Sequence, residues 1–115
     1  MFKAIIVLSR RMDMTHEEFV EWWLGEHSLL AARLPGARKV VFNVVDSAPG
    51  EAGIDGISEL WFDSQADFDA AYATQIGKAT AADSVAHVSG RVRLFVTEHE
   101  VTDASASTSP VDRGS

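Results

Sequence analysis

The sequence contains no cysteine, which excludes disulfide bonds, thiolate nucleophiles and cysteine metal ligands. Long apolar runs are also missing: the longest aliphatic stretch is Ala4–Leu8, far short of the roughly 20 residues that span a bilayer. Basic residues are scarce, with no cluster longer than Arg10-Arg11 and a net charge of −7. We therefore expect neither a membrane nor a nucleic acid as partner. The apolar run after Lys3 is too short for a secretory signal, which predicts a cytoplasmic protein.

The remaining composition is typical of a globular domain. Hydrophobic residues make up 46% of the 115 residues and charged residues 23%. Almost all of the apolar content lies in residues 1–101, which we interpret as one domain. Residues 102–115 contain only Val111 as a sizeable hydrophobe. We expect this polar C-terminal tail to be flexible unless it docks on a neighbouring subunit.

Local patterns predict four strands and three helical segments. Residues 2–9 are apolar at nearly every position, as in a strand that is covered on both faces. Thr15, with Glu18 three residues later, forms a capping box for a helix that Pro35-Gly36 ends. Ser64 is the expected N-cap of the next helix, which a break near residues 74–77 separates from a short helix over residues 78–87. The other strands are expected at residues 37–46, 56–62 and 91–101, with a turn-rich loop at 47–53.

The resulting β-α-β-β-α-β order predicts a ferredoxin-like α+β fold, with both helical regions on one face of a four-stranded antiparallel sheet. The first two strands are apolar on both sides, so a monomer would expose an apolar sheet face. Stacking of two such faces predicts a homodimer that closes as an α+β barrel. The alternative is a monomer whose sheet is covered by the C-terminal tail.

His27 is the strongest candidate for a catalytic residue. It lies four residues after Trp23, so both side chains are expected on one side of the first helix. A half-buried imidazole with a pKa near 6.5 can accept and return a proton at physiological pH. The alternative is a structural histidine that interacts with the C-terminal end of its helix.

Two carboxylates are candidate partners in acid–base chemistry. Glu59 shares a strand face with Trp61, and a carboxylate among apolar neighbours is expected to have a raised pKa. The alternative is an edge-strand glutamate that faces solvent. Asp83 lies shortly before the last strand and is a candidate to orient His27; its alternative is a solvated surface aspartate.

Aromatic residues provide candidate walls for a flat ligand. The predicted substrate-binding set is Trp22, Trp23, Phe42, Trp61 and Tyr72; core packing is the alternative for each, most of all for Phe42 and for one of the adjacent tryptophans. His16 and His99 have acidic neighbours and are expected to be exposed, and His87, which precedes an expected Ser89-Gly90 turn, is a weaker candidate for the pocket. No histidine pair has metal-ligand spacing and no glycine-rich phosphate loop occurs, so we expect no metal and no cofactor.

A family resemblance follows from four short motifs in order: Trp22-Trp23 with His27, Leu34-Pro35-Gly36, the segment from Glu59 to Ser64, and Leu94 to Glu98. Together they resemble the EthD-like family of the dimeric α+β barrel superfamily over residues 2–101. The family is related to a cofactor-free methylmuconolactone methylisomerase, whose active site uses a helix histidine eight residues before the Pro-Gly turn. The resemblance implies that role for His27. Val40 stands where that enzyme has a tyrosine, and its cysteines have no counterpart here.

These observations predict a small cofactor-independent enzyme for an apolar oxygenated ring compound such as a lactone, quinol or polyketide. The reaction would be an isomerisation, a cyclisation or an elimination of this compound in which a histidine transfers the proton. Three alternatives remain: a cofactor-free monooxygenase, a non-catalytic small-molecule-binding accessory of a degradative oxygenase pathway, and a haem-binding protein with His27 as axial ligand.

Overall fold

The computed structural model describes residues 1–46 and 53–106. Most of the predicted loop at 47–53 and of the C-terminal tail at 102–115 therefore lies outside the described residues. Within the described part of the chain, no helix combines the length and the apolar character that crossing a bilayer requires.

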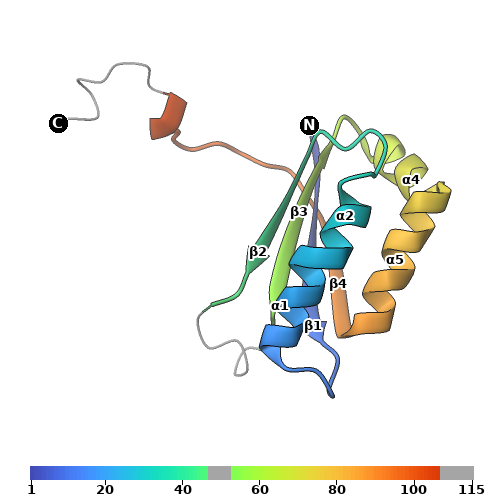
Figure 1. The fold of residues 1–115 in the computed structure, drawn as a ribbon. Coiled ribbons are helices and arrows are strands. Elements are labelled where there is room, and N and C mark those ends of the chain that lie inside the picture. The colour runs from blue at the N-terminus through green and yellow to red at the C-terminus, as the bar shows by residue number, and fades with distance from the viewer. Residues whose placement is uncertain (47–52, 107–115) are drawn as a thin grey trace.

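Four strands form one antiparallel sheet in the order β2-β3-β1-β4. They are β1 (Phe2–Arg10), β2 (Lys39–Val44), β3 (Gly56–Phe62) and β4 (Val88–Val96). Helices α1 (His16–Trp22), α2 (Ser28–Ala31), α4 (Gln65–Ala73) and α5 (Gln75–His87) all lie on one side of the sheet (Figure 1). This is the ferredoxin-like α+β arrangement that the order of elements predicts.

The helix boundaries follow from side-chain caps. The Thr15 hydroxyl accepts a hydrogen bond from the Glu18 backbone N–H, and the Glu18 carboxylate accepts one from the Thr15 N–H, which confirms the capping box. Ser64 caps α4 as predicted. Thr74 ends α4 and caps α5, so α5 begins at Gln75, three residues earlier than expected.

The last strand differs most from its prediction. It was expected over residues 91–101, but β4 is Val88–Val96 and follows α5 directly, so Ser89-Gly90 lies in the strand and not in a turn. The strand ends early because Val96 already pairs with Lys3, close to the beginning of β1. Residues 97–103 then leave the sheet and are exposed (Figure 1). The second strand is likewise shorter than its predicted range of 37–46.

The register separates two faces of the sheet. Ala4, Ile6 and Leu8 on β1 point toward the helices and form the core with Leu60 and Phe62, all at most 6% exposed. Residues at the alternate positions form the open face, which no helix covers. There, Val92 and Leu94 are 53% and 47% exposed.

Candidate active site

A π-helical turn, Trp23–His27, joins α1 to α2 and determines where His27 points. In a π-helix residues five apart come into line, and the rings of Trp22 and His27 are indeed 4.9 Å apart. The predicted proximity of Trp23 to His27 is also found, because both rings stack against Phe42 on β2, at 4.3 and 5.9 Å. The turn therefore directs the imidazole toward the sheet, where it is 5% exposed.

Two consecutive residues of α5 hold the His27 ring. Its Nδ1 lies 2.9 Å from Asp83 Oδ2, and its Nε2 lies 3.3 Å from Ser84 Oγ. A carboxylate accepts hydrogen bonds, so we assign the ring proton to Nδ1. The lone pair of Nε2 then faces Ser84, whose hydroxyl donates to it. This is the tautomer that a general base needs.

Burial of His27 changes its acid–base behaviour. Desolvation lowers the pKa of His27 below its usual 6.5, although the Asp83 carboxylate acts in the opposite direction. The imidazole is therefore neutral at pH 7 and available to accept a proton.

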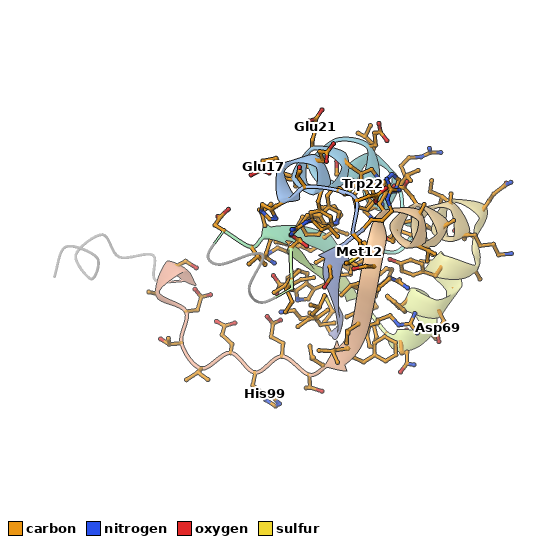
Figure 2. All side chains as sticks on the ribbon, turned by 90° about the horizontal axis from the view of Figure 1, so that it is seen from below. Met12, Glu17, Glu21, Trp22, Asp69 and His99 are labelled. Atoms are coloured by element: carbon orange, nitrogen blue, oxygen red, sulfur yellow. The ribbon has the colours of Figure 1, made fainter. Side chains whose placement is uncertain are left out.

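Asp83 is itself fixed by two further side chains. Trp22 Nε1 donates to Asp83 Oδ2 at 3.1 Å, and His87 Nδ1 lies 3.4 Å from Asp83 Oδ1. The His87 ring stacks on Trp22 with centroids 4.2 Å apart. Figure 2 shows Trp22 turned toward α5, while Glu17 and Glu21 project from the outer side of α1. The predicted contact between Asp83 and His27 is thus present, and His87 lies beside it.

A small cavity lies between His27 and the sheet. Its volume of about 10 Å³ is close to what one water molecule needs. Apolar side chains, among them Ile6, Leu60 and Phe42, make up part of its wall. Its polar lining consists of His27, Ser58, Tyr72, Thr80, Ser84 and Arg91. Buried imidazole, hydroxyl and guanidinium groups in one apolar chamber can support proton transfer.

Four of the polar lining residues were not predicted from the sequence: Ser58, Thr80, Ser84 and Arg91. Alternation along β4 is a signal that would have identified Arg91, because it places Arg91 on the same side as Phe95, which contacts Phe68 of α4. Tyr72, which was predicted, reaches the cavity from α4. Burial raises the pKa of the Tyr72 phenol, so this group stays protonated at neutral pH.

An open apolar groove shares part of its wall with this cavity. Phe42 and Ala31 line both spaces, and the outer groove, about 380 Å³ in volume, is further lined by Leu24, Leu29 and Val40. The groove therefore lies next to the cavity that His27 lines.

The structure does not bring Glu59 or Trp61 to this site. Both lie on the open face of the sheet, where Glu59 Oε1 is 2.8 Å from Lys3 Nζ. The hydrogen bond from Lys3 lowers the pKa of Glu59, so the expected raised pKa is wrong. Trp61 Nε1 donates to Glu98 Oε1 at 3.1 Å. The open face supplies cationic partners that the sequence pattern did not reveal.

One exposed histidine was predicted correctly and one wrongly. His99 is exposed on the segment after β4 (Figure 2). His16, by contrast, is partly buried, with Nδ1 2.7 Å from Oδ1 of Asp55. Asp55 is 1% exposed, forms an ion pair with Arg10 and donates its backbone N–H to the Leu8 carbonyl oxygen of β1. Among the described residues, no group of three or more His, Asp or Glu is arranged to hold a metal ion.

Comparison with known proteins agrees with this α+β class. A family model for the EthD domain matches residues 11–90, so the chain belongs to the EthD family, as its motifs indicated. An EthD family protein from Bacillus halodurans is 22% identical, with a TM-score of 0.74 over 86% of this chain and 99% of that one. No curated protein matches.

Two further solved structures have the same fold. A hydroxynitrile lyase from Passiflora edulis is 15% identical, with a TM-score of 0.70 over 89% of this chain and 96% of that one. A dimeric ferredoxin-like protein of unknown function from Thermobifida fusca is 18% identical, with a TM-score of 0.69 over 84% of this chain and 90% of that one.

Proposed function

We propose that this EthD family protein is a small cofactor-independent enzyme that moves a proton on an apolar, oxygenated ring compound, with His27 as the base. The supporting observation is the buried imidazole: Nδ1 is hydrogen-bonded to Asp83, and Nε2 accepts from Ser84, which lines the same small cavity as the His27 ring. That a structural neighbour is a hydroxynitrile lyase supports an enzymatic role for this fold.

The proposed step is isomerisation of an unsaturated lactone. Nε2 of His27 removes a proton from the carbon beside the carbonyl group, and the electron pair moves to the carbonyl oxygen. The imidazolium that forms is stabilised by the Asp83 carboxylate, 2.9 Å from Nδ1. His27 then returns the proton to a different carbon of the ring. No electrons are exchanged, so no redox partner is needed.

A ring compound needs more room than the cavity offers at rest. Phe42 and Ala31 line both the cavity and the outer groove, and rotation of the larger Phe42 side chain is the proposed way to join the two spaces. The joined space brings the ring against Phe42 and beside Tyr72, which are two of the predicted substrate-binding residues. Trp22 and Trp23 would act indirectly. Trp22 holds Asp83 through its Nε1–H, and Trp23 stacks on Phe42.

The test uses α-angelica lactone, whose conversion to the conjugated β isomer requires this proton transfer. We expect the wild-type protein to catalyse the conversion, followed by ultraviolet absorbance, and His27→Gln to lose about 10²-fold or more of the rate. His99→Gln, a change at an exposed histidine, is the matched control and should retain full activity. A wild-type rate equal to that of buffer, or a fully active His27→Gln variant, would contradict the proposal.

A second candidate function rests on the Ser84 hydroxyl, 3.3 Å from Nε2 of His27. With Asp83 on the other side of the ring, the three groups have the order of a serine hydrolase triad. Attack by Ser84 on the lactone carbonyl, followed by water, would give the ring-opened keto acid. The product therefore distinguishes the two reactions, and Ser84→Ala should abolish hydrolysis while leaving isomerisation largely intact. Tight binding of the lactone without either product would favour a non-catalytic accessory role.

We further propose that the protein works as a homodimer joined through the open faces of the two sheets. This face exposes Val92 and Leu94, and the related Thermobifida protein is described as dimeric. Two such faces stack about 10 Å apart. Leu94→Asp should yield monomers in sedimentation experiments, whereas Val85→Asp, a matched change of an exposed hydrophobe on α5, should remain dimeric. A dimeric Leu94→Asp variant would contradict this interface.

A further inference from the structure

Arg91 is the one charged side chain of the cavity wall whose role the proton transfer described above leaves open. It lies on β4 opposite Leu8 of β1, on the face of the sheet that the helices cover. Its Nε is buried and has no hydrogen-bond partner among the described residues. None of the ion pairs found in residues 1–46 and 53–106 includes Arg91.

An unpartnered guanidinium N–H in the interior is costly. A buried donor without an acceptor has lost its hydrogen bond to water and gained none in return. Native proteins leave few such groups, and those that remain call for an explanation such as a ligand. The carboxylate of the site, Asp83, interacts with His27, Trp22 and His87 and does not line the cavity. The missing acceptor therefore has to come from outside the described residues.

The surroundings of Arg91 indicate what kind of acceptor fits. His27, Ser84 and Tyr72 line the same cavity. Burial is the main cause that lowers the pKa of His27, and the charge of Arg91 adds to it. Burial raises the pKa of Tyr72 while Arg91 opposes that rise, so the guanidinium is close enough to act on both rings. The cavity thus holds one fixed positive charge beside a base that would leave negative charge on its substrate.

We propose that Arg91 binds the substrate's carbonyl oxygen through Nε–H and stabilises the enolate that forms when His27 removes the proton. This inference rests on the proposed function and specifies the substrate class: a lactone or ketone with an acidic C–H bond next to its carbonyl group. The electron pair of that C–H bond moves to the oxygen that faces Arg91, and it returns to carbon when His27 gives the proton back. A hydrocarbon or simple ether offers no such oxygen and would not be a substrate.

The first test measures binding, which does not depend on turnover. Tetronate is a stable planar lactone anion that resembles the enolate, and γ-butyrolactone is its neutral counterpart. In titrations followed by tryptophan fluorescence, we expect wild-type protein to bind tetronate more tightly than γ-butyrolactone. Arg91→Met should weaken tetronate binding by at least about 10-fold and change γ-butyrolactone binding much less. Equal tetronate affinity in wild-type protein and Arg91→Met would overturn the inference.

Control variants separate this role from a structural one. Arg93→Met removes the next arginine on the same side of β4, which lies over the Phe68 and Phe95 rings and does not line the cavity, so tetronate binding should persist. Arg91→Lys keeps the charge and should restore part of the affinity. If Arg91→Met does not fold, as judged by circular dichroism, Arg91→Lys is compared with wild-type protein. A role of Nε–H as hydrogen-bond donor predicts weaker tetronate binding in Arg91→Lys, and equal binding would overturn that role.

The second test measures rate and distinguishes the two proposals. If wild-type protein isomerises α-angelica lactone, Arg91→Met should lower kcat by about 10²-fold, the usual effect of losing one oxyanion donor. Unchanged kcat in Arg91→Met would overturn the Arg91 role and leave the His27 mechanism intact. Tetronate binding that depends on Arg91 in a protein without isomerase activity would instead support the oxygen site and reject the proposed reaction.

Discussion

Similar residues have different surroundings on the two sides of the sheet. On the helix side, Trp22 of α1 and His27 of the π-helical turn both donate to the Asp83 carboxylate of α5. On the open face, Trp61 and Lys3 both contact Glu98. The first cluster surrounds a buried imidazole that lines a cavity, whereas the second is an ion-pair network on the side of the sheet that the helices leave open. We propose a chemical role only for the tryptophan–carboxylate pairing that the helices shield from water.

The two faces also differ in the cause of a pKa shift, although its direction is the same for Glu59 and His27. Glu59 on the open face has a pKa lowered by its lysine partner, which stabilises the charge that the group already carries. His27 has a pKa lowered by burial, which leaves it neutral and able to accept a proton. Arg91 has no acceptor for its Nε among the described residues. The covered face therefore differs from the open face in having a buried hydrogen-bond donor without a partner, and not only in its charges.

The largest expected effect is on stability, and it compares the packing of a leucine on each face of the sheet. Leu60 on the covered face is 2% exposed and Leu94 on the open face is 47% exposed. Leu60→Ala should lower the free energy of unfolding by about 2–5 kcal/mol in urea denaturation, at every protein concentration. Leu94→Ala should cost less, and its effect should vary with protein concentration because it acts through the dimer. Equal, concentration-independent losses would contradict the assignment of the two faces.

The next effect concerns the carboxylates. Asp83→Asn should lower the rate of lactone isomerisation by about 10²-fold, because the amide no longer fixes the His27 tautomer or stabilises its charged form. The matched change Glu59→Gln, on the open face, should leave the rate per folded molecule nearly unchanged. A similar loss in both variants would mean that the open face also takes part in the reaction.

The smallest effect is a pH dependence of stability. Folding lowers the pKa of His27, so between about pH 6.5 and the lower folded value the unfolded chain binds more protons. The contribution of His27 to stability is therefore complete above pH 6.5, falls as the pH drops below that value, and levels off below the folded pKa. Urea midpoints measured from pH 7.5 to 5 should fall more steeply for wild-type protein than for His27→Gln. Parallel curves would show that the ring is not buried as a neutral group.

Much of the fold could be predicted because its signals are local. The Thr15 capping box, the Ser64 cap and the alternation of β3 each depend on neighbouring residues, and each is found in the structure. The end of β4 could not be predicted, because it is set by pairing with Lys3 in the distant first strand. His16 was placed wrongly for the same reason, since its partner Asp55 is remote in sequence.

The candidate site was predicted only in part. His27 and Asp83 could be named, but their geometry depends on the π-helical turn, for which no sequence signal was recognised. Glu59 and Trp61 are residue types that suit an acid–base or ligand-binding site, but they lie on the open face of the sheet. Periodicity alone does not say which face the helices cover. Ser84 and Arg91 become part of the site only when α5 and β4 pack against His27.

The most direct test of the central idea is the nitrogen NMR spectrum of the His27 ring as a function of pH, with His27→Gln used to assign its signals. We predict a neutral ring at pH 7 with the proton on Nδ1, and a titration midpoint below 6.5. A midpoint at or above 6.5, or a ring that carries its proton on Nε2, would contradict the assignment of His27 as a base facing the cavity.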